Sequence, residues 1–467
     1  MLERRFNLSK HNTSIRTELL AGLTTFLTMS YILFVNPSIL SQTGMDYSSV
    51  FIATCIASAL GTLLIGLLAN LPMAQAPGMG LNAFFTYTVV FSMGYSWQQG
   101  LAIVFLSGVL FLICTVTGLR ATIIKAIPKN LKLAIAPGIG LFIALIGLNN
   151  AGLVEVNQGP IINIILDNEV LQKDVLIDQI KNAPSQIIQF GKLSDPSVLL
   201  TAFGFVVLTI LMVKKIKAAM IWAILITTLV GIPMGVTIIP SSYDVSQISL
   251  SPTFFKMDFA GLFMSDAGES ISQLILTTTI VIISFTMVDL LDTLGTLLGT
   301  ASKGDLLDDD GNLPRMNKAL FANASATTVG AVLGTSSVTT YIESSSGIIA
   351  GGRTGLTSVA AGTLFLLGIF LAPIAGIVPV AATSPVLIMV GVLMFDGIRK
   401  IDLSSMASTI PAILLIIIMP FTYSIANGIA FGLMFYVLIQ VTLGKAREVH
   451  PVLYVLVALF MLKYVAL

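Results

Sequence analysis

Three carboxylates stand in stretches of sequence that otherwise carry no charge. Glu343 lies in the segment VTTYIESSSG, residues 338–347, and Asp289 and Asp292 lie in SFTMVDLLDTLGTLLGT, residues 284–300. A carboxylate in such a setting can accept charge-assisted hydrogen bonds from the N–H groups of a ligand, or it can take up and release a proton. These three residues are therefore the first candidates for ligand binding and proton transfer.

Asp289 and Asp292 share one face of a predicted helix, because residues three apart lie on the same side. This region also contains polar and small residues, namely Thr293, Gly295, Thr296 and Gly299. Glycines at a spacing of four let a neighbouring helix or a ligand come close. We predict that Asp292 belongs to a binding site, whereas Asp289 fits a site residue and a structural partner equally well.

Glu343 and Asn82 each have a structural alternative. Glu343 could cap a half-helix that begins at Ser344, since free amides and the helix dipole stabilise an acid at that position. Asn82 follows a glycine-rich break, where its amide could bind a ligand or satisfy the broken backbone. His11 and His450 both lie outside the predicted spans. Any proton coupling must therefore run through carboxylates.

The composition places these residues in a membrane. Of the 467 residues, 55% are hydrophobic and 10% are charged, and the mean hydropathy is +0.95. Soluble domains carry about a quarter charged residues. Apolar runs of roughly 20 residues, the length that crosses a bilayer, recur along this chain. The sequence predicts a polytopic membrane protein, in which each carboxylate inside a span is a functional hypothesis.

Several other classes of site are excluded. The net charge of +1 says nothing about partners, but the lack of a basic patch with interleaved aromatic residues argues against nucleic acid. Cys55 and Cys114 both lie in apolar spans, which argues against a disulfide framework. The acidic loop 302–318 fails as a calcium loop, because aligning its glycine places Leu306 at the first ligand position and Asn317 at the twelfth. We predict no metal and no cofactor.

The predicted spans fall into two sets of seven. Apolar runs bounded by polar residues, glycine or proline give the spans 18–40, 49–70, 74–92, 99–118, 130–150, 197–213 and 217–238, followed by 271–300, 316–334, 338–352, 355–375, 378–398, 404–421 and 423–443. An odd number of spans per half inserts the second half upside down, which is typical of secondary transporters. With the N-terminus in the cytoplasm, 19 of the 24 Lys and Arg residues lie in cytoplasmic loops.

The predicted spans divide the chain into five segments and indicate where the protein is located. We predict a multi-pass protein of the plasma membrane, with a cytoplasmic tail at 1–16, a first repeat at 17–240 that includes an external loop at 151–196, an external linker at 241–270, a second repeat at 271–445, and a C-terminal segment at 446–467 that lies on the interface or forms an extra helix.

The third span of each half is broken at the corresponding place. LPMAQAPGMGLNAFFTY, residues 71–87, is interrupted by prolines and glycines, and GTSSVTTYIESSSGIIAGG, residues 334–352, is dense in β-branched and hydroxylated residues. Neither favours a continuous helix. Backbone that is not helical is tolerated at membrane depth only where protein buries it or where it lines a cavity. Two matching breaks therefore predict one central site built from both halves.

Three longer motifs carry a resemblance to a known family. QAPGMGLNAFF (75–85), VDLLDTLGTLLGTASKGDLLDDDGNLP (288–314) and GTSSVTTYIESSSGIIAGGRTGLTS (334–358) resemble the AzgA-like purine branch of the nucleobase:cation symporter family, which is related to the uracil and xanthine permeases. The resemblance extends from about residue 16 to about residue 445. It implies fourteen spans in two inverted repeats, a core domain and a gate domain, a short strand and a half-helix in spans three and ten, and proton-coupled uptake of hypoxanthine, guanine or adenine. It is also compatible with a homodimer.

The resemblance also assigns site residues. The substrate-binding acid of the eighth span corresponds to Asp292, that of the tenth span to Glu343, and the contact from the third span to Asn82. Neighbouring site positions correspond to Tyr341, Ser344 and Thr296. The related uracil and xanthine carriers usually have glutamate where this chain has Asp292, which leaves more room here.

A mechanism and its rivals follow. A purine presents ring N–H groups to a carboxylate, and such hydrogen bonds contribute more to binding when the groups are removed from water. Glu343 or Asp292, with Asp289 as a further candidate, would take up a proton outside together with the substrate and release it inside. The rivals are an anion carrier of the sulfate type with the same fold, a channel, and an intramembrane enzyme. Two carboxylates inside the spans argue against an anion site, and no His/Cys set or paired acidic motif supports an enzyme.

Overall fold

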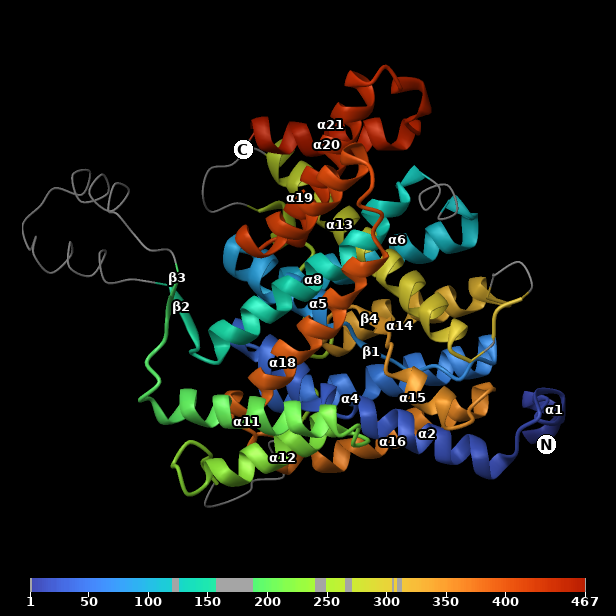
Figure 1. Ribbon diagram of the computed structural model, residues 1–467, viewed down its shortest axis with the longest axis vertical. Helices are drawn as coiled ribbons and strands as arrows, with labels where there is room; N and C mark the ends of the chain where they lie inside the picture. Colours follow the sequence, from blue (N-terminus) through green and yellow to red (C-terminus); the bar gives the residue numbers. More distant parts are fainter. Residues whose placement is uncertain are drawn as a thin grey trace, which may run out of the picture.

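The computed structural model describes residues 2–119, 126–156, 188–239, 249–264, 271–304, 306–308 and 313–466. Within these ranges the protein is almost entirely helical (Figure 1). Nine helices of the described part are long and apolar enough to cross a membrane, and shorter apolar helices stand between them. The expected polytopic, helical membrane protein is thereby confirmed, while the number of fourteen spans stays a prediction.

The first half begins with a short terminal helix and ends before the 241–270 segment. Its elements are α1 (Leu2–Phe6), α2 (Ile15–Met29), α3 (Ile32–Leu40), α4 (Tyr47–Leu64), the π-helical turn η3 (Ile65–Ala69), β1 (Gln75–Pro77), α5 (Met79–Ala83), the π-helical η4 (Phe84–Ser92), α6 (Trp97–Thr117), α8 (Lys129–Asn150), β2 (Val154–Val156), β3 (Ile188–Phe190), α11 (Pro196–Val213) and α12 (Ala219–Gly231).

The second half repeats this order of elements. It contains α13 (Ile271–Ser302), α14 (Met316–Leu333), β4 (Val338–Thr340), α15 (Ser344–Ile349), α16 (Gly355–Leu367), α17 (Ala372–Ala375), α18 (Val380–Phe395), α19 (Met406–Phe421), α20 (Ile425–Thr442) and a terminal helix, α21 (Pro451–Ala466). Each of the predicted spans corresponds to one or more elements of the two halves.

Two predicted spans differ from the structure. The first span is not continuous, because α2 ends at Met29 and α3 begins at Ile32, with Ser30 and Tyr31 between them. The seventh ends at Gly231 rather than at 238. The sequence GIPMG that begins there contains a proline and two glycines, which terminate helices, and apolar composition alone does not register this.

The helices pack into two bundles, each built from both halves of the chain. The first bundle contains α2, α4, α6, α14 and α16, and the second bundle contains α8, α11, α12, α18, α19 and α20. Helices of the two halves therefore intermix, as expected of intertwined inverted repeats. The boundaries 17–240 and 271–445 of the repeats, and the division into a core domain and a gate domain, remain predictions.

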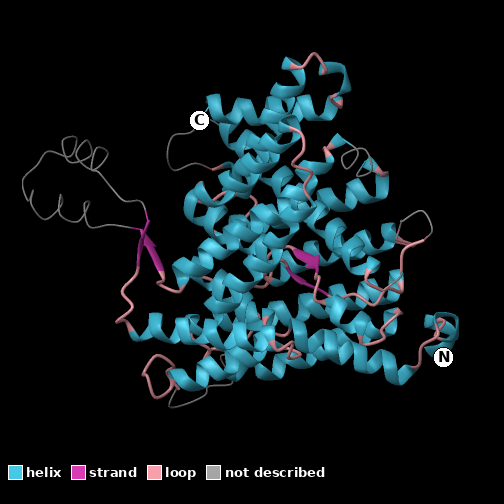
Figure 2. Cartoon of the chain, viewed as in Figure 1, coloured by secondary structure: helices cyan, strands magenta, loops and turns pink. Residues whose placement is uncertain are grey.

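The two broken spans meet at the centre of the molecule. β1 and β4 pair antiparallel, with Gln75 opposite Thr340, Ala76 opposite Thr339 and Pro77 opposite Val338. Figure 2 shows this small sheet surrounded by helices. Each strand is followed by a short helix, α5 or α15. The expected strand and half-helix in spans three and ten are confirmed, and each strand satisfies the backbone of the other where no helix can.

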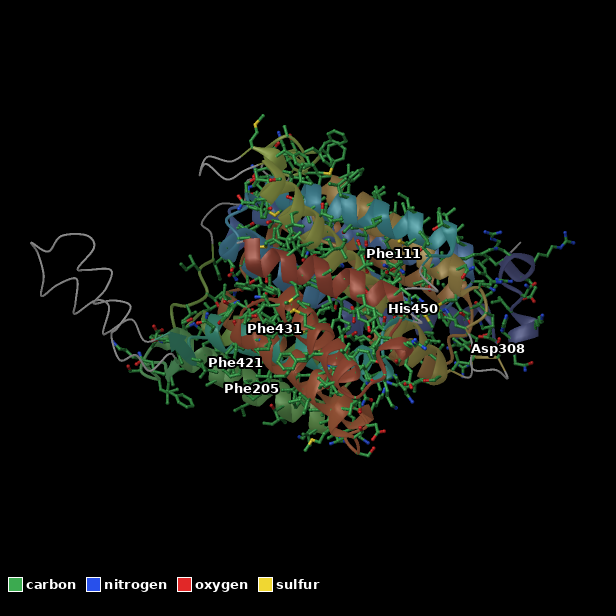
Figure 3. The ribbon with its side chains drawn as sticks, turned by 90° about the horizontal axis from the view of Figure 1, so that it is seen from above. Phe111, Phe205, Asp308, Phe421, Phe431 and His450 are labelled. Atoms are coloured by element: carbon green, nitrogen blue, oxygen red, sulfur yellow. The ribbon has the colours of Figure 1, made fainter. Side chains whose placement is uncertain are left out.

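α1 and the β2–β3 hairpin lie at opposite ends of the molecule (Figure 1), and which end faces the cytoplasm stays a prediction. Asp308, in the loop that precedes α14, lies at the same end as α1 (Figure 3). Many large apolar side chains are exposed in the described structure, for example Phe370 at 80% and Val213 at 76%. Exposed apolar side chains in such number suit contact with lipid. α21 packs against α20 and α13, and its place in the membrane stays a prediction.

Candidate substrate site

Asp292 joins α13 to the central sheet. Its Oδ2 accepts a hydrogen bond of 3.3 Å from Oγ1 of Thr339, which is in β4. The Asp292 side chain is only partly buried. Two glycines that follow it on the same side of α13, Gly295 and Gly299, have open space beside them, because a Cβ atom built on either would meet no atom within 4 Å in the described structure. We expect a ligand to approach Asp292 along this glycine face.

Glu343 stands between β4 and α15, and it is also only partly buried. Its side chain makes no capping hydrogen bond to α15 in the described structure, which contradicts the capping alternative. Instead, the hydroxyl group of Tyr31 donates a 2.7 Å hydrogen bond to Glu343 Oε1. This leaves the second carboxylate oxygen for another donor.

Asn82 lies in α5 and is completely buried. Its Oδ1 accepts a hydrogen bond from the hydroxyl group of Ser336, just before β4. Its Nδ2 has no hydrogen-bond partner among the described residues. A buried amide donor without a partner costs about 1–3 kcal/mol. The arrangement therefore favours a ligand that offers an acceptor to Asn82.

Three of the predicted site hydroxyls are used within the protein. Tyr341 donates to the carbonyl oxygen of Pro77, and Ser344 Oγ accepts the backbone N–H of Ala74 at 2.9 Å. Thr296 donates within its own helix, to the carbonyl oxygen of residue 292 at 2.9 Å or of residue 293 at 3.0 Å. Tyr341 and Ser344 thus fasten the two breaks together. Any contact that these three residues make with a ligand stays a prediction.

Asp289 is engaged differently from Asp292. It is 1% exposed, and its carboxylate accepts from Asn323 Nδ2 at 3.0 Å, Thr293 Oγ1 at 3.2 Å and Thr327 Oγ1 at 3.0 Å. Asn323 and Thr327 lie on α14, so Asp289 ties α13 to its neighbour in the first bundle. Of the two roles considered for Asp289, the geometry favours the structural partner.

Two important residues were not predicted from the sequence. Tyr31 holds Glu343, and no sequence signal marked it, because the helix break at its position was not predicted. Glu18 of α2 is fully buried, and its carboxylate accepts the backbone N–H groups of Arg353, Thr354 and Thr357, at 2.9, 3.3 and 3.1 Å. These amides are at the start of α16, so Glu18 caps a helix of the other half. Its place at the very start of the first predicted span, next to the charged N-terminal tail, gave no sign of this role.

The arrangement as a whole gathers two acids and one amide around the β1–β4 sheet. Asn82 is held from the β4 side by Ser336, Asp292 by Thr339, and Glu343 by Tyr31. Such a set can accept hydrogen bonds from two or more N–H groups of one small ligand and donate one in return. The fold and this central site define a membrane transporter with inverted repeats.

The chain belongs to the Permease family (Xan_ur_permease), which matches its residues 16–177 and 170–431. It is 41% identical over 466 residues to the adenine permease AdeP of Escherichia coli (strain K12), covering 100% of this chain and 96% of that protein. It is 41% identical over 471 residues to the guanine/hypoxanthine permease PbuG of Bacillus subtilis (strain 168), covering 99% of each.

Solved structures show the same fold at low sequence identity. The transmembrane domain of a cyanobacterium bicarbonate transporter, BicA, aligns with a TM-score of 0.60 at 14% identity, over 88% of this chain and 97% of that one. The murine anion transporter Slc26a9 in its inward-facing state aligns with a TM-score of 0.58 at 12% identity, over 92% and 69%. The expected membership and fold are thus confirmed.

Proposed function

We propose that this protein imports purine nucleobases, namely hypoxanthine, guanine or adenine, across the plasma membrane by proton symport with alternating access. The observation that carries the proposal is the gathering of Asn82, Asp292 and Glu343 at the junction of the two broken spans. The names of the relatives, which are adenine and guanine/hypoxanthine permeases, support the substrate class.

The chemistry of a purine fits these three groups. Ring N–H groups of the base donate to the free oxygens of Asp292 and Glu343, and a ring nitrogen or an exocyclic oxygen accepts from Asn82 Nδ2. The open face of α13 beside Asp292 gives the flat base a route to the site. The base satisfies the buried amide donor of Asn82, which is otherwise without a partner in the described structure.

Proton coupling is assigned to Glu343 or Asp292. Both lie in spans where a bare charge is costly, so a proton taken up together with the base lets the loaded site change its orientation without moving that charge through apolar surroundings. The tyrosine bound to Glu343 can donate to it whether or not the carboxyl is protonated. We expect the proton to enter from outside with the base and to leave inside, with the N-terminus in the cytoplasm.

An anion carrier is the second candidate, because the solved structures of similar fold are bicarbonate and anion transporters by title. These likenesses are at 12–14% identity and concern the fold alone. An anion site requires cations or amide donors, whereas the present site presents two carboxylates. The chemistry of the site therefore favours the purine.

The test is uptake of radiolabelled hypoxanthine, guanine, adenine, xanthine and uracil into cells that lack their own carriers. Wild type is compared with Glu343→Gln, Asp292→Asn and Asp289→Asn, at equal amounts of inserted protein and with and without a protonophore. We expect purine uptake that the protonophore abolishes, loss of uptake in the first two variants, and retention in Asp289→Asn. Normal transport by Glu343→Gln would refute the site, and absence of nucleobase uptake by wild type would refute the substrate.

A further inference from the structure

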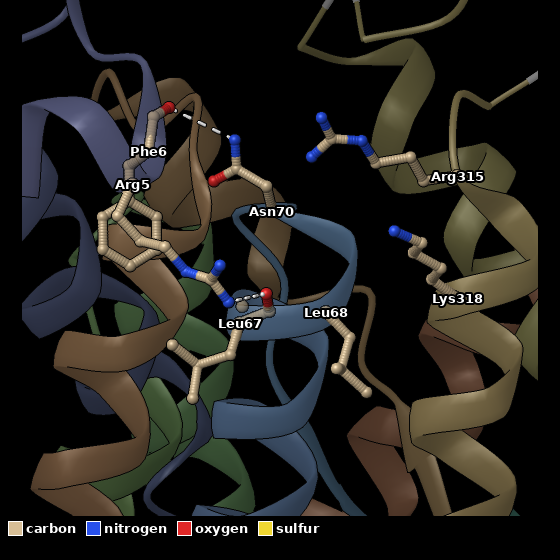
Figure 4. A pocket seen from close by; sticks show the side chains of 8 residues that line it. Arg5, Phe6, Leu67, Leu68, Asn70, Arg315 and Lys318 are labelled. Atoms are coloured by element: carbon tan, nitrogen blue, oxygen red, sulfur yellow. Dashed lines mark hydrogen bonds between the residues drawn. The ribbon is translucent and has the colours of Figure 1, made fainter.

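A polar cavity lies away from the central site, at the end of the molecule where α1 lies. It has a volume of about 280 Å³ and is lined by residues in or next to α1, η3 and α14, namely Arg5, Phe6, Leu67, Asn70, Arg315 and Lys318, among others. Figure 4 shows Arg315 and Lys318 extending from one wall toward the wall that carries Arg5 and Asn70. Three cations from distant parts of the sequence thus face one space.

The walls of the cavity are held in place by contacts of uncharged residues. Phe6 is 3% exposed and packs with Leu8 and Leu356, which anchors α1. Asn70 donates to the carbonyl oxygen of Phe6 at 3.2 Å and accepts the backbone N–H of Gly355 at 2.8 Å. These contacts fix the floor of the cavity and the helix that carries Arg5.

The three cations lack a carboxylate partner in the described structure. The ion pairs found there are Arg399–Asp396 and Lys445–Glu448, both elsewhere. Within the cavity, Arg5 donates to the carbonyl oxygen of Leu67 at 2.9 Å and Arg315 to that of residue 69 at 3.5 Å. Each contact uses one of the five donors of a guanidinium and leaves its charge uncompensated. Such a cluster attracts an anion with several acceptor oxygens.

The border of the cavity is apolar. Leu67 and Leu68 are 42% and 37% exposed at the end of a membrane-spanning helix, and Leu2 is 43% exposed on α1. Basic side chains next to exposed leucines at the end of a span match the boundary between lipid head groups and acyl chains. The guanidinium fork is well suited to two oxygens of one phosphate.

We propose that the cavity formed by Arg5, Arg315 and Lys318 binds a phosphate group, carried by an anionic phospholipid or by a soluble phosphate compound. Binding would connect α1 with the start of α14 through one shared anion, on the side of the membrane where the N-terminus lies. This site is separate from the substrate site and does not depend on the identity of the transported solute.

The test uses the full-length protein purified in a zwitterionic or neutral detergent. A short-chain phosphatidylglycerol is titrated, with phosphatidylcholine of the same chain length as the uncharged comparison, and binding is followed by native mass spectrometry. Inorganic phosphate is then added as a competitor. The double variant Arg315→Gln/Lys318→Gln is compared with Arg4→Gln/Lys10→Gln, which removes the same charge from exposed positions that do not line the cavity.

The expected results are specific to the cavity. Removing two of its three cations should weaken phosphatidylglycerol binding about 30-fold, as follows from the usual contribution of a basic residue near an anionic lipid. The control pair should change it less than about threefold by the same reasoning, since its side chains do not converge. Binding of phosphatidylglycerol that phosphate does not displace identifies a lipid site, and binding of phosphate alone identifies a soluble ligand.

Two outcomes would overturn the proposal. One is equal weakening in the two double variants, which would mean general attraction to a basic surface. The other is no binding of either probe to wild type, as expected if Asp308 and the two aspartates that follow it in sequence neutralise the cations. Unfolding midpoints of the two double variants in phosphatidylcholine, measured in parallel, establish that both proteins are folded.

Discussion

The Tyr31→Phe substitution isolates one atom of the proposed site. The Tyr31 hydroxyl donates a 2.7 Å hydrogen bond to Glu343 Oε1, and the tyrosine ring is completely buried. Phenylalanine keeps the ring and its packing but removes the donor. We expect the carboxyl of Glu343 to lose its preferred orientation, so that its second oxygen no longer faces the substrate reliably.

The size of the effect follows from the kind of hydrogen bond. A hydrogen bond to a charged group contributes about 1.5–3 kcal/mol. Glu343 is only partly buried, so water can replace part of the lost interaction and the lower end of this range applies. About 1.5 kcal/mol corresponds to roughly tenfold in affinity. We therefore expect the KM for purine uptake to rise about tenfold, with a smaller change in the maximal rate.

The assay is concentration-dependent purine uptake at equal amounts of inserted protein. Tyr47→Phe is the matched control, because the Tyr47 hydroxyl donates to the backbone carbonyl of Ala375 at 3.2 Å or of Phe34 at 3.5 Å and has no hydrogen bond to a carboxylate among the described residues. An unchanged KM in Tyr31→Phe, or the same change in both variants, would refute the claim that Tyr31 orients Glu343. A lower KM would mean that Tyr31 competes with the substrate for the carboxylate, which is the opposite of the mechanism proposed.

Two further predictions concern the elements that support the site. Glu18→Ala should lower the free energy of unfolding by roughly 3 kcal/mol, since several buried donors at the start of α16 lose their acceptor. Unfolding in detergent measures this free energy. An effect no larger than that of Glu3→Ala, at an exposed position, would contradict the prediction. Gly80→Ala should reduce transport, because the added Cβ would stand 2.5 Å from a methyl group of Ile139 on α8, and overpacking of about 1–3 kcal/mol would displace α5. Gly376→Ala should transport normally, because no atom of the described structure lies within 4 Å of the Cβ added there. Equal purine uptake by the two variants would refute this reasoning.

The two broken spans could be predicted from the sequence because the residues that break them act locally. Prolines and glycines around residues 72–80 and the β-branched run before Glu343 disfavour a helix whatever surrounds them. Their equal position in each half predicted a common site. The register, with Ala76 opposite Thr339, could not be predicted, because it depends on how two segments more than 250 residues apart approach each other.

For the acids inside the spans, too, the sequence predicts one part of the answer and the structure decides the other. That Asp289, Asp292 and Glu343 matter follows from sequence alone, since a charge inside a span needs a reason. Their separate environments do not follow from it. Asp289 meets three donors from α13 and α14, whereas Asp292 faces open space beside glycine. Two residues three positions apart on one helix differ because different neighbours pack against them.

The sequence by itself determined the class of protein, the sites of the two breaks and the acids inside the spans, because hydropathy, helix-breaking residues and isolated charge act locally. Only the tertiary structure decided which groups hold those acids. Tyr31 reaches Glu343 across 312 positions of the chain, and Glu18 reaches Thr357 across 339. Contacts of this kind exist only after the two halves have packed together, so no local pattern predicts them.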